Sequence, residues 1–246
     1  AFYPMHESAF DDLAAYGENP IGNGPYKLAE WNHNQDAIIV PNEEYSGDRA
    51  AQNDGINFVF YAQQDASYAD LLAGNLDVTD AIPDSAFATF NDELGERAVN
   101  QPAAIFQSFT IPERLEHFGG EEGKLRRAAI SRAINREEIT ATIFDGTRTP
   151  ATDFTSPVIA GHTDTLNGAE VLEYDPEEAK RLWEEADKIN PWTGTFAISY
   201  NADGGHQAWV DAVANSIKNT LGIEAEGNAY PDFKSLRDDV TKREIT

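Results

Sequence analysis

The C-terminal part of the chain alternates strand-like and helix-like segments, and this alternation constrains the fold more than any other feature of the sequence. Residues 195–200 are predicted to form a strand, residues 207–221 a helix, residues 223–226 a second strand, and a last helix begins at Asp232. Gly222 is expected to end the first of these helices. An alternation of this kind predicts an α/β protein in which helices pack on a mixed sheet.

The middle of the chain carries the clearest helix signals. Two helices are predicted between residues 124 and 146, and Asn135 with Glu138 forms the capping signature of the second. Another helix begins after Asp175, where Glu178 stands at the same spacing. In each case the cap precedes a stripe of apolar residues at helical spacing, so two independent signals agree.

The first 55 residues are less regular, because glycine and proline interrupt them closely. Only a hairpin is indicated there, with strands at residues 26–31 and 37–40. A segment this short cannot bury a core unaided, so we expect it to pack on another part of the protein. From residue 56 on, we predict strands at 56–61, 76–78 and 103–110 and helices at 65–74, with Asp65 as its N-cap, and at 83–94.

The net charge narrows the functional classes. The chain has 246 residues, with 18 lysines and arginines against 43 aspartates and glutamates, and its formal charge is −25 at pH 7. A nucleic-acid partner requires clustered basic residues, so we predict no nucleic-acid binding. There is no long apolar run and no cysteine, which excludes a membrane span and thiolate chemistry within this sequence. The five histidines lack metal-binding spacing, and we predict no cofactor and no local metal site.

One segment has the position of a ligand site. Residues 199–206 leave a predicted strand at its carboxyl end, turn through two glycines and enter a helix, which is where open α/β sheets bind ligands. Asn201 can donate and accept hydrogen bonds, and His206 at the helix start can bind a polar or anionic group. The structural alternative is that Asn201 and Asp203 cap the helix and His206 is a surface residue. Three aromatic rings at strand ends either wall a cleft or pack at the boundary of the core: Tyr61, Phe109 and Tyr200.

Six motifs stand in order along the chain. They are residues 22–31 (Gly-Asn-Gly-Pro-Tyr-Lys-Leu-Ala-Glu-Trp), 73–78 (Ala-Gly-Asn-Leu-Asp-Val), 125–128 with 133–139, Gly146 with 149–151, 174–179 (Tyr-Asp-Pro-Glu-Glu-Ala) and 221–223. Together they resemble the large extracytoplasmic solute-binding proteins of bacterial ABC importers, the family with oligopeptide-, dipeptide- and nickel-binding members. Each motif alone would be weak, but their common order is specific.

The resemblance implies a two-lobed binding protein of which this chain is a fragment. Residues 1–55 would be the end of lobe one with a hairpin near the hinge, and residues 56–246 would be lobe two, incomplete at its C-terminus. This lobe would have the α/β, mixed-sheet fold of periplasmic binding proteins. On matched positions, Asn201 and His206 fall where peptide-binding members contact ligand, and Tyr61 and Phe233 are weaker matches.

The resemblance also implies a function and partners. The protein would be a non-enzymatic receptor that captures peptides outside the cytoplasmic membrane, in the periplasm or at the membrane's outer face. It would close its lobes on the ligand and deliver it to the transmembrane permease subunits of an ABC transporter. Peripheral attachment to the membrane, as in a lipoprotein, would use a part outside this chain.

Two alternatives remain open. The first keeps the fold and changes the solute to a sugar, a nickel chelate, haem or an opine. A nickel chelate would require a histidine and an arginine near the cleft, and the sequence contains both residue types without bringing them together. An acidic hydrolase would need two carboxylates at a fixed separation in one cleft, and with 43 acidic residues neighbouring pairs carry little information.

Overall fold

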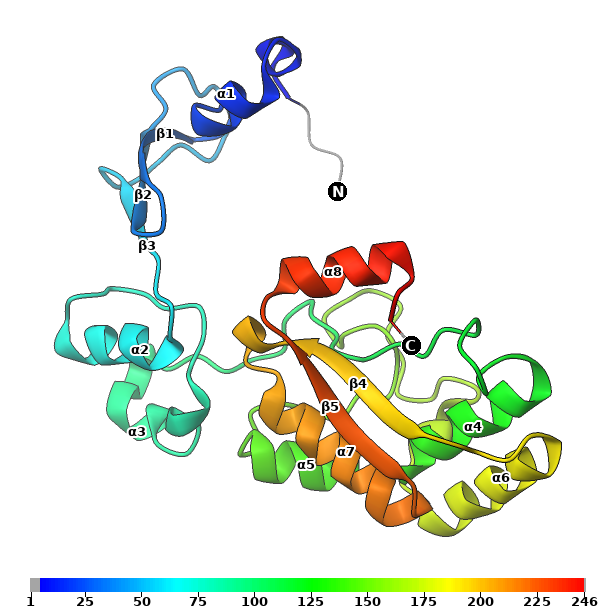
Figure 1. Cartoon of the computed structure of the whole chain (residues 1–246). Coiled ribbons are helices and arrows are strands. Elements are labelled where there is room, and N and C mark those ends of the chain that lie inside the picture. Colours follow the sequence, from blue (N-terminus) through cyan, green and yellow to red (C-terminus); the bar gives the residue numbers. More distant parts are fainter. Residues whose placement is uncertain (1–4, 246) are drawn as a thin grey trace. The chain divides into compact units, whose positions relative to one another are not determined.

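The computed structural model of the chain describes residues 5–245 (Figure 1). The chain forms two compact units, one ending at Pro83 and the other beginning at Asp84, and each is described by itself. The predicted lobe boundary between residues 55 and 56 coincides with the start of a strand in the first unit. Compactness of a unit does not define a lobe, so that boundary stays a prediction.

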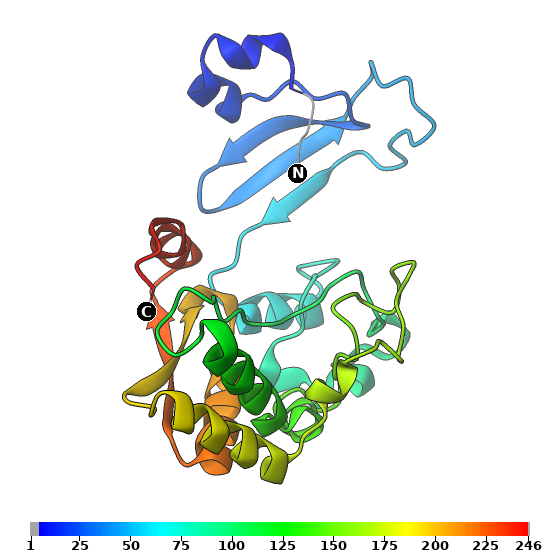
Figure 2. The ribbon, with the colours of Figure 1, turned by 90° about the vertical axis from the view of Figure 1, so that its right-hand side faces the viewer.

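The first unit is built around a three-stranded antiparallel sheet. Strand β1 (Tyr26–Asn32) pairs with β2 (Asp36–Pro41), and β3 (Ile56–Val59) pairs with the other edge of β2, so the three strands run side by side (Figure 2). The pairing of Asn32 with Asp36 closes the tight turn of the predicted hairpin, which is confirmed. The remaining elements of the unit are η1 (Glu7–Phe10), α1 (Leu13–Glu18) and α2 (Gln64–Ala73).

Helix α2 corrects two predictions. Its N-cap is Gln63, not Asp65, and Asp65 lies in the first turn, where a negative charge favours the helix N-terminus. Gly74 ends the helix in the left-handed conformation at φ 78°, as predicted. Residues 76–78 form no strand, because the backbone N–H groups of residues 75 and 76 both turn back to the carbonyl oxygen of Asp70.

The described part of the second unit places a two-stranded parallel sheet among six α-helices. Strand β4 (Thr195–Asn201) pairs with β5 (Glu224–Tyr230), and helix α7 (Gln207–Leu221) connects them and packs on both. This is the strand, helix and strand unit that the sequence predicts, and it makes the fold α/β. The other elements are η2 (Asp84–Ala86), α3 (Phe90–Leu94), η3 (Gly95–Arg97), α4 (Gly120–Ala133), α5 (Arg136–Ile143), η4 (Ala169–Leu172), α6 (Pro176–Ile189), η5 (Ala202–Gly204) and α8 (Phe233–Lys242).

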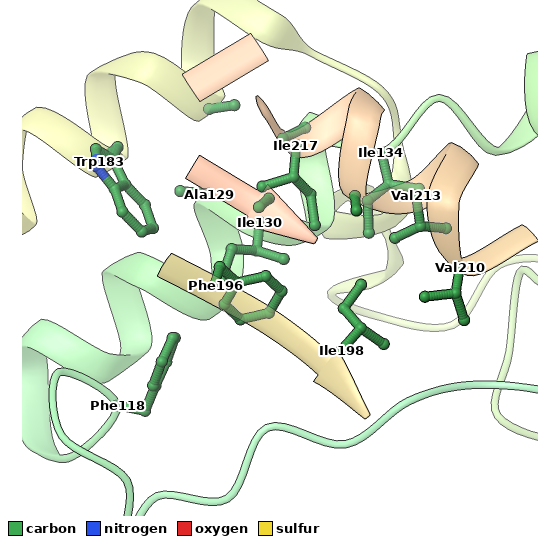
Figure 3. Packing of buried hydrophobic residues seen from close by; sticks show 14 of the residues in the cluster. Phe118, Ala129, Ile130, Ile134, Trp183, Phe196, Ile198, Val210, Val213 and Ile217 are labelled. Atoms are coloured by element: carbon green, nitrogen blue, oxygen red, sulfur yellow. The ribbon is translucent and has the colours of Figure 1, made fainter. Parts of the chain in front are cut away.

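The core of the second unit lies where α4, α6, α7 and β4 meet (Figure 3). Each element contributes the apolar face that its sequence period predicts. On β4 that face is every second residue from Phe196 to Tyr200, and on α7 it includes Val210, Val213 and Ile217. Burying a side chain of this size contributes about 1.5–3 kcal/mol. The helices and strands that carry the candidate ligand residues are therefore held by a continuous core.

Helix caps confirm the local predictions. The Asn135 side chain accepts a hydrogen bond from the backbone N–H of Glu138 at 3.2 Å, and Asp175 accepts one from the backbone N–H of Glu178 at 3.0 Å. Asp232 caps α8 in the same way, with a bond of 2.7 Å from the backbone N–H of Ser235. Each such cap contributes about 1 kcal/mol.

Two predicted elements of the second unit are wrong in detail. The helix expected over residues 83–94 is broken into η2 and α3. The buried strand expected over residues 103–110 forms no ladder, and Ile105 is 77% exposed. The backbone N–H of Ile105 donates to the carbonyl oxygen of Ala103 at 2.7 Å. This hydrogen bond closes a local turn and does not join Ile105 to a neighbouring strand.

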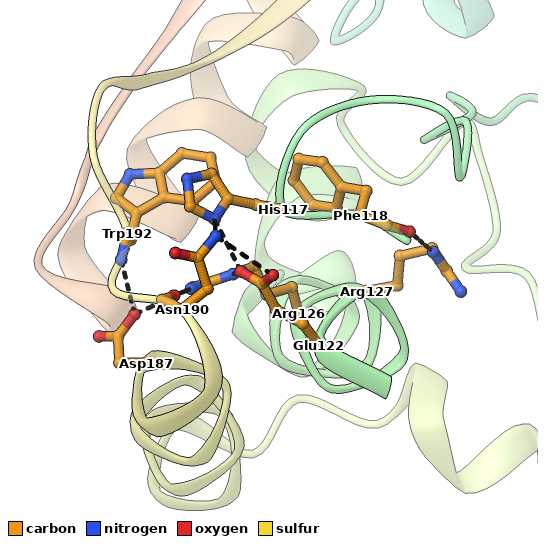
Figure 4. Close-up of polar contacts among 8 residues, drawn as sticks. All are labelled: His117, Phe118, Glu122, Arg126, Arg127, Asp187, Asn190 and Trp192. Atoms are coloured by element: carbon orange, nitrogen blue, oxygen red, sulfur yellow. Dashed lines mark hydrogen bonds and ion pairs between the residues drawn. The ribbon is translucent and has the colours of Figure 1, made fainter. Parts of the chain in front are cut away.

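A buried ionic cluster ties the ends of α4 and α6 together (Figure 4). Arg126 on α4 has no exposed surface; its Nε donates to Glu122 at 2.9 Å, and its Nη2 donates to Asp187 at 3.0 Å and to the carbonyl of Asn190 at 2.6 Å. Its guanidinium group stacks over Trp183, 4.4 Å from the ring centroid. Two of its three nitrogens and its face are therefore satisfied, while Nη1 is buried without a hydrogen-bond partner among the described residues.

Glu122 is the hub of this cluster. Its carboxylate also contacts Nδ1 of His117 at 2.7 Å. Burial works against the charged form, but the bonds from His117 and Arg126 outweigh it, and the pKa of Glu122 lies below its usual range.

Among residues 5–245 no helix is long and apolar enough to cross a membrane, and no three side chains of metal-binding type converge.

Candidate functional site

The candidate site is the loop that joins β4 to α7. Asn201 ends the strand, η5 follows, and Gly205 turns the chain in the left-handed conformation at φ 66° before His206 begins the helix. A Cβ atom built on Gly204 would lie 2.5 Å from Nε2 of His206 and 2.6 Å from Nδ2 of Asn201. Both side chains therefore lie against the same α-carbon, which only glycine permits, and the two predicted ligand residues are neighbours in space.

The protonation state of His206 follows from its contacts. Nε1 of Trp209, one turn along α7, donates a hydrogen bond to Nδ1 of His206 at 3.1 Å. An indole N–H can only donate, so Nδ1 acts as the acceptor, and this assigns the proton of the neutral ring to Nε2. Desolvation and the positive charge of Arg148 lower the pKa of His206, against the opposing effect of Asp203. At neutral pH His206 is an uncharged donor.

Asn201 is oriented by an acidic neighbour. Its Nδ2 donates to Oδ1 of Asp203 at 2.6 Å, while Oδ2 of Asp203 accepts the backbone N–H of Phe233 at 3.4 Å. The same carboxylate thus connects the loop to the first residue of α8. With its amide nitrogen engaged, the carboxamide of Asn201 retains its oxygen as an acceptor.

The pair has the hydrogen-bonding pattern of an amide partner. Asn201 offers a carbonyl oxygen and His206 offers an N–H, on two neighbouring side chains that are both partly exposed. A peptide unit carries one N–H and one C=O, so it can satisfy both groups at once. No acid and base of matched pKa are needed for such an interaction, and the pair is suited to binding.

An open depression of about 450 Å³ adjoins the loop at the first turn of α7. It is shallow, and its lining mixes two carboxylates with small and amide side chains: Asp84, Ala202, Gly205, Gln207, Ala208 and Asp211. It gives access to the loop from solvent. A second hollow, about 230 Å³, lies between α5 and α7 and is lined by Ile139, Asn215 and Asn219 among others, so it does not include the loop.

The other predicted residues have separate surroundings. Tyr200 is buried in the core and lies beside Gly227, on the opposite face of β4 from Asn201. Phe109 is half-buried and packs edge-on to Phe196, with ring centroids 6.4 Å apart. Phe233 is 57% exposed at the start of α8. The structure brings Phe233 to the loop through its backbone, and leaves the rings of Tyr200 and Phe109 in or beside the core.

Tyr61 belongs to the first unit. Its hydroxyl donates to Oδ2 of Asp70 at 2.7 Å, and this bond raises the pKa of Tyr61 while lowering the pKa of Asp70. The ring is partly buried. Its part in a ligand site stays a prediction.

Sequence reasoning missed the residues that orient the pair. Trp209 is not among the predicted ligand residues, although its position three residues after His206 places it on the same helix face. Asp203 was read as a possible cap, yet it bridges Asn201 and Phe233. The charge of Arg148 next to His206 had no local signal, since 58 residues separate the two positions.

Comparison with known proteins gives a family and a fold. Residues 1–245 match the model of the family described as bacterial extracellular solute-binding proteins, family 5, middle part. The dipeptide-binding protein DppE of Bacillus subtilis is 24% identical over 234 residues, which are 92% of this chain and 42% of that protein. The chain therefore spans less than half the length of this relative.

Two solved structures extend the comparison. The murein tripeptide binding protein MppA of Escherichia coli superposes with a TM-score of 0.79 at 22% identity, over 97% of this chain and 47% of that one. The binding protein AgaA of A. tumefaciens R10, in complex with agropinic acid, superposes with a TM-score of 0.67 at 20% identity, over 95% of this chain and 47% of that one. At these identities the likeness is one of fold.

Proposed function

We propose that this chain, which belongs to the bacterial extracellular solute-binding proteins of family 5, is the ligand-gripping part of a longer receptor that captures peptides outside the cytoplasmic membrane. The receptor delivers the peptide to the permease of an ABC importer by closing its lobes. Attachment to the membrane uses a part outside residues 1–246. No covalent bond is made or broken.

The observation that carries this proposal is the neighbouring pair at the end of β4. Both side chains lie against Gly204, and together they offer one acceptor, the oxygen of Asn201, and one donor, the Nε2–H of His206. Groups that recognise the main chain bind peptides of varied sequence, because every peptide carries the same N–H and C=O. Tyr61, Phe109, Tyr200 and Phe233 are proposed as aromatic neighbours of the ligand or of the core that supports it.

The test is calorimetry of the whole protein with pools of two- to five-residue peptides. We expect one pool or more to bind, and H206A to weaken binding by about 1–1.5 kcal/mol, the usual net value of one hydrogen bond. Absence of binding by every pool at every length would contradict a peptide receptor. The substitution Asn228→Ala, on the exposed part of β5, is a matched control that should bind normally.

A second candidate keeps the fold and changes the solute. The likeness to AgaA, whose structure contains agropinic acid, favours a compact acidic molecule of the opine type. Nickel chelates, sugars and haem belong to the same alternative. Native mass spectrometry of the protein purified from its own cells would identify a retained ligand by mass, and a ligand that is not a peptide would support this second candidate.

A further inference from the structure

The exterior of this protein carries far more negative charge than its own cations can balance. The formal charge is −25 and the sequence isoelectric point is about 4.3. The imbalance is greatest in residues 1–83, because this part of the sequence contains one lysine, Lys27, and one arginine, Arg49. That region carries 14 acidic residues, and residues 84–246 carry another 29 against 16 lysines and arginines. The excess is therefore a property of the whole surface and not of one acidic patch.

Some of the few basic residues are buried or partly buried. Arg126 is fully buried, and Arg136 is half-buried, where its Nη1 donates to the carbonyl oxygens of Ser131 and Leu172, each at 2.9 Å. Arg127 likewise donates to the carbonyl of Phe118 at 2.5 Å. Arg126 also pairs with Glu122 and Asp187, and Arg127 also pairs with Glu113. These buried or partly buried arginines leave fewer cations at the surface to face the other exposed carboxylates.

Two of the exposed cations are each shared between two carboxylates. On α6, Arg181 contacts both Glu178 and Glu185 at 2.6 Å. At the end of α8, Lys242 stands 3.9 Å from Asp239 and 3.8 Å from Glu244. Exposed pairs of this kind each contribute little, about 0–1 kcal/mol. They cannot offset the mutual repulsion of the carboxylates around them.

Solvent cations are the remaining source of countercharge. Repulsion between exposed charges acts over the Debye length, which is about 8 Å at physiological ionic strength and about 3 Å at 1 M salt. A large net charge destabilises the compact state through this self-repulsion, and high salt removes it. We propose that molar concentrations of monovalent salt stabilise the folded state of this protein, and that the partner of its acidic exterior is the cation atmosphere of a hypersaline medium.

The proposal has a consequence for ligand capture that is separate from the proposed function. At a Debye length of about 3 Å, the charge of the protein cannot steer a ligand or a permease from a distance. Recognition then depends on contacts at short range. The neutral pair of Asn201 and His206 has this character, since neither group carries charge at neutral pH.

The experiment is thermal unfolding of the full chain, followed by circular dichroism, in KCl from about 0.1 M to about 2 M. We expect the midpoint temperature to rise by on the order of 10 °C over this range. Sucrose at matched viscosity controls for general stabilisation by excluded solutes, and it should not replace the salt.

A pair of variants separates charge from other effects of salt. The quadruple variant E137Q/E173Q/E184Q/E226Q removes four exposed carboxylates that belong neither to the core nor to the candidate site. We expect it to be more stable than the parent in about 0.1 M KCl and to gain less from added salt. The matched variant E137D/E173D/E184D/E226D keeps the charge and should keep the parent's salt dependence.

Two results would overturn the proposal. One is a midpoint temperature of the parent that is the same at both ends of the salt range. The other is an equal salt response in the Gln and Asp quadruple variants, since that response would not depend on the charge. Ligand binding plays no part in either measurement, so a failure of the peptide assignment would leave this test unaffected.

Discussion

Trp209 donates a hydrogen bond from its indole Nε1 to Nδ1 of His206, at 3.1 Å, and this bond fixes which ring nitrogen of the histidine can face a ligand. The bond is local, spanning three residues at the start of α7, so it forms as soon as the helix does.

Replacing Trp209 with phenylalanine should remove the hydrogen bond that holds His206 in its Nε2–H tautomer. We expect W209F to retain the fold, because the ring stays, but to show a mixture of Nδ1–H and Nε2–H forms in place of one. Nitrogen chemical shifts of the His206 ring, measured by NMR at pH 8, report the two forms directly. Trp192 is the matched control, since its indole donates to the carbonyl of Gly194, and W192F should leave the ring of His206 unchanged.

Gly204 should tolerate no side chain without moving the pair. An added methyl group would meet the ends of Asn201 and His206, at 2.6 Å and 2.5 Å, and these flexible ends can shift at small cost. We therefore expect G204A to change the free energy of unfolding by less than about 1 kcal/mol while weakening ligand binding about tenfold. Gly22, with open space around it, is the control, and G22A should bind normally. If G204A and G22A bound the ligand equally well, Gly204 would not be part of the ligand site.

The buried cluster around Arg126 should be the most sensitive point of the second unit. Removing the guanidinium group leaves Glu122 buried beside an empty site, so R126A is expected to lose about 3–5 kcal/mol of unfolding free energy. R126K should also be destabilised, because an ammonium group cannot serve three acceptors in one plane. Urea unfolding measures both, and R237A, at an exposed position of α8, provides a baseline within about 0.5 kcal/mol of the parent.

Glu122 predicts the direction of the pH dependence. Its pKa in the folded protein lies below the unfolded value of 4.5, so the folded state binds its proton less tightly than the unfolded state. The stability that this carboxylate contributes is present above pH 4.5 and is lost as the pH falls through the folded pKa. In E122Q that acid-dependent part should be absent, and urea unfolding between pH 3 and pH 6 should give a flatter curve than the parent. If the stability of E122Q fell with pH as steeply as that of the parent, other carboxylates would be the cause of the acid sensitivity.

Elements that depend on local contacts could be predicted from the sequence. The hairpin of β1 and β2 and the caps at Asn135 and Asp175 each depend on residues within a few positions of one another. The segment over residues 103–110 could not be judged in this way, because a strand forms only where a neighbouring strand accepts its hydrogen bonds. Composition gave no information on that neighbour.

The candidate site shows the same division. Its place was predictable, since the end of a strand and two glycines before a helix mark a loop where ligands bind. The burial of Tyr200 also follows from period two, which puts it on the face of Phe196 and Ile198. The charge of Arg148 near His206 and the full burial of Arg126 were not predictable, because each depends on residues far away in the sequence.

Asn201 and His206 should act as one unit toward a peptide. If both bind the same amide group, loss of either one lets the ligand shift and weakens the bond to the other. We expect N201A and H206A each to cost about 1–1.5 kcal/mol of binding free energy. The double variant should cost less than their sum, with a coupling energy of at least about 0.5 kcal/mol. Calorimetry with one tightly bound peptide measures all four corners of this cycle. Strictly additive losses would mean that the two side chains contact separate parts of the ligand, and the amide pairing would then be wrong.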